Sequence, residues 1–355
     1  MKKSIPILAL FFLALFSNLS FAGGHQFPVR NASGSWGYID SNGKPTIAVQ
    51  FEDAKPFSEG YAAVKKGGCW AYIDESGRSI TEFVFTRAAN FSEGLAAVQK
   101  KGEPCTGYID TKGNVFLNST YIEGEDFSEG LAAVRNSLGT GWGYIDKTGK
   151  TVIGPRFVME APRPFKDGLA GVRIDGKWGF IDKKGNVAIT PRFFNALDFS
   201  EGVAMVQEIA LRKARINTSA PVEPKGGKCG FIDRQGNYAI NPSFDEASGF
   251  SEGFAPVKTG DKWGYIDRKG TLVISPNYQL AEDFSEGLAV VLIQGPPDYK
   301  TLFGYIDKKG SYAIKPASCF NAFSFSGGLA LVITEDNRTI YLDPSGKVIW
   351  NSGTK

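Results

Sequence analysis

The chain has 355 residues, of which 42% are hydrophobic, 13% aromatic and 22% charged, and it contains 43 glycines. This composition excludes a disordered chain or a coiled coil, and its glycine and aromatic residues favour strands and turns. A net charge of +3 is too small to provide the basic surface that general binding to nucleic acids or anionic membranes requires.

The first 22 residues have the pattern of a cleavable secretion signal. Two lysines precede an apolar run from Ile5 to Phe16, and Ser20 and Ala22 are small residues at the −3 and −1 positions of a cleavage site. The run is about 12 residues long, shorter than the roughly 20 of a membrane span, and no cysteine follows it. We therefore expect cleavage after Ala22 and a periplasmic or secreted chain, residues 23–355, without a lipid anchor or a membrane span; an uncleaved anchor is the alternative.

Two sequence blocks recur along the rest of the chain, which is the pattern of a repeat architecture. The first block, Trp-Gly-Tyr-Ile-Asp at residues 36–40, occurs in nine intact or degenerate copies. The second block, Phe-Ser-Glu-Gly at residues 57–60, occurs in eight copies, and a small apolar run such as Leu95 to Val98 follows each one. The copies of the first block end at Asp40, Asp74, Asp110, Asp146, Asp182, Asp233, Asp267, Asp307 and Asp343.

Each repeat is predicted to form three strands, which we name A, B and C. The small apolar run predicts strand A, Trp-Gly-Tyr-Ile predicts strand B, and runs such as Thr151 to Ile153 predict strand C. An Asp-x-x-Gly sequence separates B from C in all nine copies. It predicts a tight turn, because Asp accepts backbone N–H bonds and Gly tolerates a positive φ. Four of these structural turns are Asp40 with Gly43, Asp146 with Gly149, Asp182 with Gly185, and Asp267 with Gly270.

These blocks resemble the WG-repeat, or KWG-repeat, family of bacterial proteins over essentially the whole chain after residue 22. The resemblance implies a β-rich repeat scaffold, mostly in exported or surface-associated proteins, with no catalytic residue common to the family. Four copies depart from the pattern because the Trp position holds Thr106, Cys229, Phe303 or Thr339.

The spacing of the blocks separates framework from variable surface. From the turn glycine to the next Phe of the second block there are 14 residues in six of eight cases, whereas the A–B connection varies between 12 and 29 residues by the same kind of count. Because connections that absorb insertions lie at the surface, we expect the A–B connections to form one rim of the stacked units and to be the candidate binding face.

We expect an all-β array of nine tandem three-stranded meander units, arranged as an open superhelical or solenoid-like array. Propellers usually have four to eight blades of four strands, which favours the open arrangement for nine three-stranded units. The alternative is a propeller-like closure of the array.

The sequence contains no constellation that indicates catalysis or a cofactor. Its one histidine, His25, precedes the first repeat, so the familiar histidine relays and clustered metal sites are excluded, and there is no phosphate-binding glycine loop. One carboxylate per Asp-x-x-Gly turn is far from the 6–8 oxygen ligands of calcium. We expect no enzyme, no cofactor and no metal, and we interpret the acidic row in the second block as solvated turn residues: Glu59, Glu93, Glu129, Asp167, Glu201, Glu252 and Glu286.

The tryptophans and cysteines admit two interpretations each. The indoles of Trp36, Trp70, Trp142, Trp178 and Trp263 could stack on sugars, although repeated aromatic residues next to Gly more often fill a core. Cys69 and Cys105 occupy the same position in consecutive units, so a disulfide between them is the best local candidate. Cys229 and Cys319 are interpreted as buried apolar residues.

Two insertions supply the candidate interaction residues. The longer, residues 207–228, carries Arg212, Lys213 and Arg215, and the shorter carries Pro297 and Tyr299. We expect a non-enzymatic exported scaffold that binds a protein or a cell-envelope polymer through this variable rim, and not a nucleic acid. The alternative function is a glycan or cell-wall binding module that uses exposed Trp residues.

Overall fold

A computed structural model describes residues 25–136, 141–210, 225–294 and 301–353, in which regular structure consists of strands and turns without a helix. These ranges contain no helix with the length and hydropathy of a membrane span. The predicted signal sequence lies outside the described residues.

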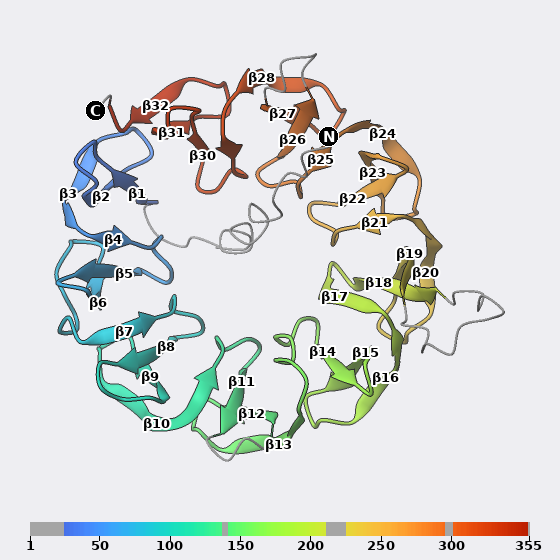
Figure 1. The fold of residues 1–355 in the computed structure, drawn as a ribbon, viewed down its shortest axis with the longest axis horizontal. Helices are drawn as coiled ribbons and strands as arrows, with labels where there is room; N and C mark the ends of the chain where they lie inside the picture. The colour runs from blue at the N-terminus through green and yellow to red at the C-terminus, as the bar shows by residue number, and fades with distance from the viewer. Residues whose placement is uncertain (1–24, 137–140, 211–224, 295–300, 354–355) are drawn as a thin grey trace, which may run out of the picture.

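The strands form nine antiparallel units that follow one another around a ring (Figure 1). In unit 1, strands A, B and C are β1 (Phe27–Arg30), β2 (Trp36–Ile39) and β3 (Pro45–Phe51). In the later units the same three strands are, in order, β5 (Tyr61–Lys66), β6 (Cys69–Asp74) and β7 (Phe85–Ala88); β8 (Leu95–Lys100), β9 (Thr106–Asp110) and β10 (Val115–Gly124); β11 (Leu131–Asn136), β12 (Trp142–Asp146) and β13 (Thr151–Phe157); β14 (Leu169–Ile174), β15 (Lys177–Asp182) and β16 (Val187–Phe193); β18 (Val203–Ala210), β19 (Lys225–Ile232) and β20 (Tyr238–Phe244); β22 (Phe254–Thr259), β23 (Lys262–Asp267) and β24 (Leu272–Tyr278); β26 (Leu288–Gln294), β27 (Thr301–Asp307) and β28 (Tyr312–Ser318); β30 (Ala330–Ile333), β31 (Thr339–Leu342) and β32 (Val348–Asn351).

A short fourth strand, which the sequence did not predict, precedes strand A in most units. We call the stretch that contains it the inner segment, because it pairs with A on the side away from B and C. The ends of β7 and β10 take this place in units 3 and 4, and in unit 5 the amide of Arg163 donates to the carbonyl of Gly171 at 2.9 Å. The separate short strands are β4 (Asp53–Ala54), β17 (Asn195–Ser200), β21 (Glu246–Ala247), β25 (Leu280–Ala281) and β29 (Asn321–Ala322).

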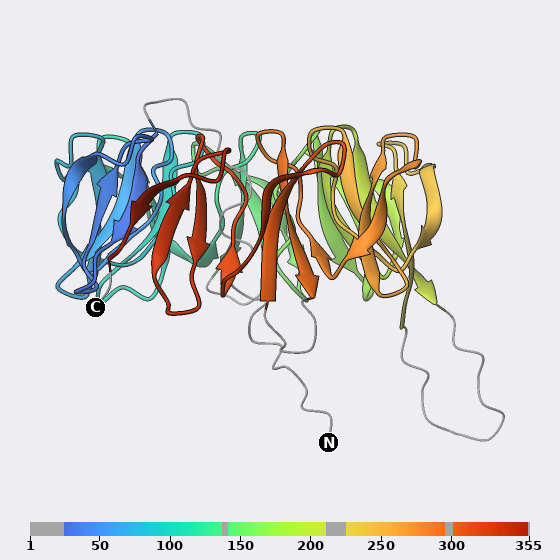
Figure 2. The ribbon, with the colours of Figure 1, turned by 90° about the horizontal axis from the view of Figure 1, so that it is seen from above.

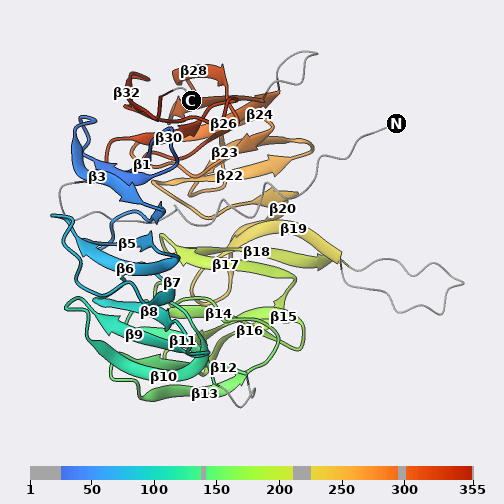
Figure 3. The same ribbon diagram turned by 60° about the vertical axis from the view of Figure 1, so that its left-hand side comes forward.

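Each unit therefore runs from the inner segment at the centre of the ring, through A and B, to C at the circumference (Figure 1). Seen from the side, the strands run between the two faces of the ring (Figure 2), and an oblique view shows the units following one another (Figure 3). Because all units have the same strand order, the A–B connections leave from one face, which we call the A–B face. The Asp-x-x-Gly turns lie at the opposite turn face.

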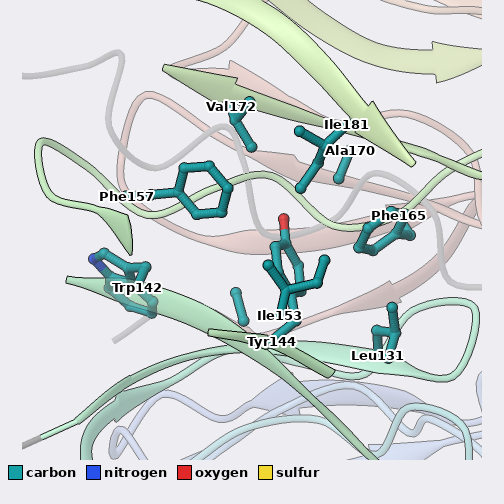
Figure 4. Packing of buried hydrophobic residues seen from close by; sticks show 10 residues of the cluster. Leu131, Trp142, Tyr144, Ile153, Phe157, Phe165, Ala170, Val172 and Ile181 are labelled. Atoms are coloured by element: carbon teal, nitrogen blue, oxygen red, sulfur yellow. The ribbon is translucent and has the colours of Figure 1, made fainter. Parts of the chain in front are cut away.

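An aromatic pair joins each unit to the next. The Tyr or Phe of strand B packs against the Phe of the following Phe-Ser-Glu-Gly block, as in Tyr144 and Phe165, whose rings are 4.9 Å apart in the core between units 4 and 5 (Figure 4). Eight such pairs have centroid separations of 4.8–5.1 Å and near edge-to-face geometry, which aromatic rings favour. Where strand B carries Tyr, the hydroxyl also donates to a carbonyl of the next inner segment, as from Tyr144 to Arg163 at 2.8 Å.

The first and last units pack against each other and close the ring. The Tyr341 ring lies 5.4 Å from that of Phe27, its hydroxyl donates to the carbonyl of Pro28 at 2.9 Å, and Val29 and Leu329 join the same core. The predicted all-β array of nine units is thus confirmed, and it has the propeller-like closure rather than the open arrangement. Closure buries the aromatic surfaces that an open array would expose at its two ends, and the inner segments provide the four strands of an ordinary blade.

The aromatic pairs should dominate the stability of the ring. Phe165 is fully buried, so Phe165→Ala should lower the free energy of unfolding by about 3–5 kcal/mol, as measured by chemical denaturation. The control is Val158→Ala, because Val158 is 74% exposed and its truncation should change stability little. Equal effects of the two substitutions would contradict the assignment of Phe165 to an inter-unit core.

Candidate functional site

The A–B face carries the two insertions that the sequence marked as candidate contact surfaces. Arg212, Lys213, Arg215, Pro297 and Tyr299 all lie outside the described residues. What the structure does describe is the base of each insertion.

The long insertion starts and ends as strand, so residues 207–228 are not wholly loop. β18 and β19 extend their pairing through Gln207 opposite Cys229 to Ala210 opposite Lys225. Two side chains fix this extension: Gln207 donates to the carbonyl of Gly227 at 3.0 Å, and the Tyr238 hydroxyl donates to Glu208 at 3.0 Å. The hairpin therefore fixes the two attachment points of the insertion, Ala210 and Lys225, on the A–B face.

The second insertion has a similar base. β26 and β27 remain paired up to Ile293 opposite Leu302 and Gln294 opposite Thr301, after which the insertion begins. Both insertions are thus held by paired strands of the same face, in units 6 and 8 of the ring.

On the turn face, the Asp-x-x-Gly carboxylates are occupied within their own turns. Asp146 accepts hydrogen bonds from the amides of Thr148 at 2.9 Å and Lys150 at 3.1 Å, and from the Thr148 hydroxyl. The hydroxyl bond lowers the pKa of Asp146, and the amide bonds lower it further. Gly149 closes the turn at a φ of 81°, where a side chain would be strained. These carboxylates thus accept hydrogen bonds from the backbone of their own turns.

The glutamates of the second block do more than the predicted solvated turn residues. Glu59 accepts from the amides of Glu93 and Gly94 in the next unit at 2.7 and 2.8 Å, and Glu129 accepts from Gly168 at 3.0 Å. These acidic residues adopt positive φ angles near 50°, which carry their side chains across the boundary between units. This role could not be predicted from the sequence, because a short acidic turn gives no signal about where its carboxylate points.

The serine of the same block also contacts the next unit. Its hydroxyl donates to the carbonyl of the following block's Phe at 2.7 Å in six boundaries, as from Ser58 to Phe91. The Phe, Ser and Glu side chains of the Phe-Ser-Glu-Gly block therefore all contact a neighbouring unit. The repeated Ser and Glu side chains thus hold consecutive units together.

The tryptophan positions are largely covered by the chain itself. Trp142 and Trp178 are buried, and the guanidinium of Arg163 lies 4.9 Å from the Trp178 ring centroid. Trp70 is half-buried and has Lys55 and Lys65 within 6 Å of its ring centroid. This arrangement favours the core interpretation of the tryptophans over sugar stacking.

The disulfide favoured between Cys69 and Cys105 is not formed. All four cysteines are free thiols, with Cys69 buried and Cys105 half-buried. Cys69 is the first residue of β6 and Cys105 immediately precedes β9, so β7 and β8 lie between them. Each strand spacing is about 4.8 Å, whereas a disulfide needs Cα atoms within about 7 Å. Equivalent positions in consecutive units are thus too far apart for a bridge. Cys229 and Cys319 are buried, and burial raises the pKa of each thiol to about 11.

A polar hollow of about 490 Å³ lies where units 1 and 2 meet at the turn face. It is lined by His25, Gln26, Asp40 and Glu75, among others, and Gln26 spans it by donating to the carbonyl of Glu75 at 2.8 Å. Throughout the described ranges, no three His, Cys, Asp or Glu side chains gather as metal ligands would.

The inner segments carry acidic side chains with perturbed protonation. Burial, together with the neighbouring charge of Asp283, raises the pKa of Glu282 to about 7. Burial also raises the pKa of Asp283 and Asp198; the Asp198 carboxylate has Arg163 3.9 Å away. Burial therefore disfavours the charged form of these carboxylates.

The raised pKa of Glu282 predicts a pH dependence of stability between about pH 4.5 and 7. Because the folded state raises the pKa of Glu282, its penalty is absent below about pH 4.5 and grows as pH rises to about 7. Glu282→Gln should increase the free energy of unfolding at pH 8 by roughly 3 kcal/mol and leave that at pH 4 nearly unchanged, measured by denaturation at each pH. Glu125→Gln is the control, since Glu125 occupies the equivalent position in unit 4 and is exposed; a similar effect there would contradict the explanation.

Two solved structures illustrate what the chain is similar to. A crystal structure described as the eukaryotic initiation factor superposes with a TM-score of 0.63 at 12% identity, covering 93% of this chain and 96% of that chain. A crystal structure of BamB from Moraxella catarrhalis has a TM-score of 0.41 at 12% identity, covering 83% of this chain and 92% of that chain. At such identity the first likeness concerns the fold alone. No curated protein sequence matches the chain.

The repeat itself is recognised by a family model for the WG containing repeat, which matches residues 36–70, 70–103, 107–137, 142–178, 178–208, 230–263, 263–295 and 303–337. These matches span most of the ring, and they contain the strand B and Phe-Ser-Glu-Gly blocks that join its units. The chain belongs to the WG-repeat family.

Proposed function

We propose that this chain is an exported, non-enzymatic scaffold that binds another protein through its A–B face. The proposal rests on the different roles of the repeated residues and of the variable connections in each unit. The repeated Tyr, Phe, Ser and Glu side chains are used between units, whereas length variation and both insertions are concentrated on the A–B face.

The extended β18–β19 hairpin supports a contact role for the long insertion. The paired strands of this hairpin, held by Gln207 and Glu208, continue on the A–B face up to Ala210 opposite Lys225, the two residues between which the charged part of the insertion is joined to the ring. Its sequence contains Arg212, Lys213 and Arg215, so the partner would present acidic side chains to it.

A glycan-binding role has less support from the tryptophans. Two of the five indoles in the strand B position, Trp142 and Trp178, are buried, so neither can offer a face to a sugar without rearrangement of a core. The remaining three are half-buried and contact the inter-unit cores.

Export rests on the leader-like sequence before the ring. If residues 1–22 are a cleaved signal, the secreted or periplasmic protein begins at Gly23. Intact-mass measurement of the protein recovered outside the cytoplasm tests this, and a mass that retains Met1 would contradict cleavage.

The role of the long insertion is tested by changing only its charge. Replacement of Arg212, Lys213 and Arg215 by Gln should reduce capture of partner proteins from envelope or culture-supernatant extracts at least tenfold, as measured by quantitative pull-down.

A matched control removes the same charge from the other face. Lys112, Lys184 and Lys269 are exposed on the turn face, and their replacement by Gln should leave capture unchanged. Equal losses in the two triple variants would point to net charge, and unchanged capture by the insertion variant would overturn the proposed role of these three side chains.

A further inference from the structure

Unit 1 differs from the other eight units at its inner edge. In units 2–9 an inner segment pairs with strand A, and its amide donates to an A-strand carbonyl, as from Lys55 to Ala63 at 2.9 Å and from Glu282 to Val290 at 3.0 Å. The sheet of unit 1 contains β1, β2 and β3 alone, and no inner segment is present among the residues described, which begin at His25.

The aromatic part of the missing inner segment is replaced from within β1. Phe27 lies opposite Ile39 of strand B. In every other strand A, alanine occupies the position that Phe27 holds here. The Phe27 ring packs on Tyr341 as the Phe of the second block does elsewhere. The alanines at this position are Ala62, Ala96, Ala132, Ala170, Ala204, Ala255, Ala289 and Ala330. The core between units 9 and 1, which we call the seam, therefore has its aromatic pair although unit 1 has no Phe-Ser-Glu-Gly block.

The backbone part of the inner segment is not replaced. The carbonyl of Pro28 corresponds to that of Ala63, but it accepts directly from the Tyr341 hydroxyl, whereas the Tyr38 hydroxyl donates to the inner-segment carbonyl of Lys55 at 2.7 Å. At Arg30 the amide points away from β2, because the next residue, Asn31, bonds across the hairpin to Ser35. The Pro28 carbonyl and the Arg30 amide thus both face the inner edge of β1, as the backbone groups of a strand do where a further strand can pair with it.

An apolar groove lies along this edge. It is lined by residues of three units, including Phe27 and Pro28 of unit 1, Pro56 of unit 2, and Ser324 and Leu331 of unit 9, and its volume is about 50 Å³. This volume suits one small side chain. The inner segments of the other units carry a small residue or proline at the corresponding point: Ala54, Ala88, Gly124, Pro162, Ala196, Ala247, Ala281 and Ala322.

We propose that the groove between units 9 and 1 accepts an extended segment of a partner protein as a ninth inner strand, with a small residue such as Ala at its centre. The eight inner segments of the same chain define the chemistry of this occupant: a short extended backbone that donates one amide to the Pro28 carbonyl and accepts the Tyr341 hydroxyl. The exchange replaces one hydrogen bond by two and buries an apolar groove, which is the usual basis of strand addition to a sheet edge.

The occupant comes from another molecule if the leader is removed. Cleavage after Ala22 leaves two residues before His25, whereas Ala54 lies seven residues before Tyr61, the first residue of strand A in unit 2. The mature chain would then be too short at this end to supply its own inner strand. The inference concerns the centre of the ring and does not depend on the proposed role of the A–B face.

A synthetic peptide with the sequence of Gln50 to Pro56 is the probe, because it copies an inner segment and ends before the Phe that Phe27 already replaces. Fluorescein-labelled peptide should bind the purified mature protein saturably, at one site per chain, as measured by fluorescence anisotropy. A scrambled peptide should bind at least tenfold more weakly. Absence of saturable binding by the native sequence would overturn the proposal.

Two matched variants locate the binding site. Ser324→Trp places an indole in the groove and should weaken peptide binding at least tenfold, whereas Gly249→Trp places one at the equivalent position of unit 7, where an added Cβ atom meets no atom within 4 Å. Both variants should retain the thermal unfolding transition. Equal affinities in the two variants would contradict binding at the seam.

Hydrogen exchange of the unmodified protein gives a second test that needs no substitution. Peptide binding should slow exchange of the Arg30 amide at least tenfold and leave that of Lys65, which already pairs with an inner strand, unchanged. If residues before His25 remain in the protein and fill the groove themselves, Arg30 is protected without peptide and the peptide does not bind, which would overturn binding in trans.

Discussion

The edge-to-face contact between a strand B aromatic ring and the Phe of the next unit is the interaction on which this fold depends. A three-stranded meander buries little by itself, and its large apolar side chains reach full burial only against a neighbour. Tyr144, for example, is buried by residues of the following unit, including Phe165 and Ala170. The need to provide every such ring with a partner, including the last, explains why the array closes.

Polar contacts give this apolar stacking its geometry. Three side chains of one unit form hydrogen bonds with the backbone of the next: the Tyr hydroxyl, the Ser hydroxyl and the Glu carboxylate. Because the three bonds lie at different places along the boundary, they fix the orientation of successive units. Backbone groups serve as partners in all three cases, which lets side chains elsewhere in the unit vary. The variable connections can then change without loss of the ring, and this is the physical basis for locating function on the A–B face.

The sequence predicted much of this fold because its signals were local and repeated nine times. The three strands, the Asp-x-x-Gly turns and the number of units follow from short patterns that carry a physical reason in each copy. The inner strand was missed because two-residue elements such as Asp53–Ala54 have no periodicity to detect. Closure was expected only as the alternative to an open array for a related reason: it depends on Phe27 meeting Tyr341 across the whole length of the chain, and no local pattern reports such a contact.

The candidate site was less predictable than the fold. The disulfide between Cys69 and Cys105 seemed reasonable from equivalent positions, but equivalence in a sequence repeat does not set a distance, and here two strands intervene. The acidic row was placed correctly in turns, yet the partners of Glu59 and Glu129 are amides of the following unit, which only the packing of two units reveals. The groove between units 9 and 1 lies where the described part of unit 1 has no inner segment, and this difference is evident only when unit 1 is compared with the other eight units.

The carboxylate-to-amide contacts all point in the same direction around the ring, from each of units 2 to 8 to its successor. In the language of quaternary structure this is a heterologous, head-to-tail interface, the kind that produces a closed ring only when a fixed number of copies completes the turn. Separate subunits would have to find that number by assembly. Here a single chain contains all nine copies, so their number is set by the sequence. The boundary between units 9 and 1 differs from the other eight, so a partner can recognise one position on a ring of nine similar units.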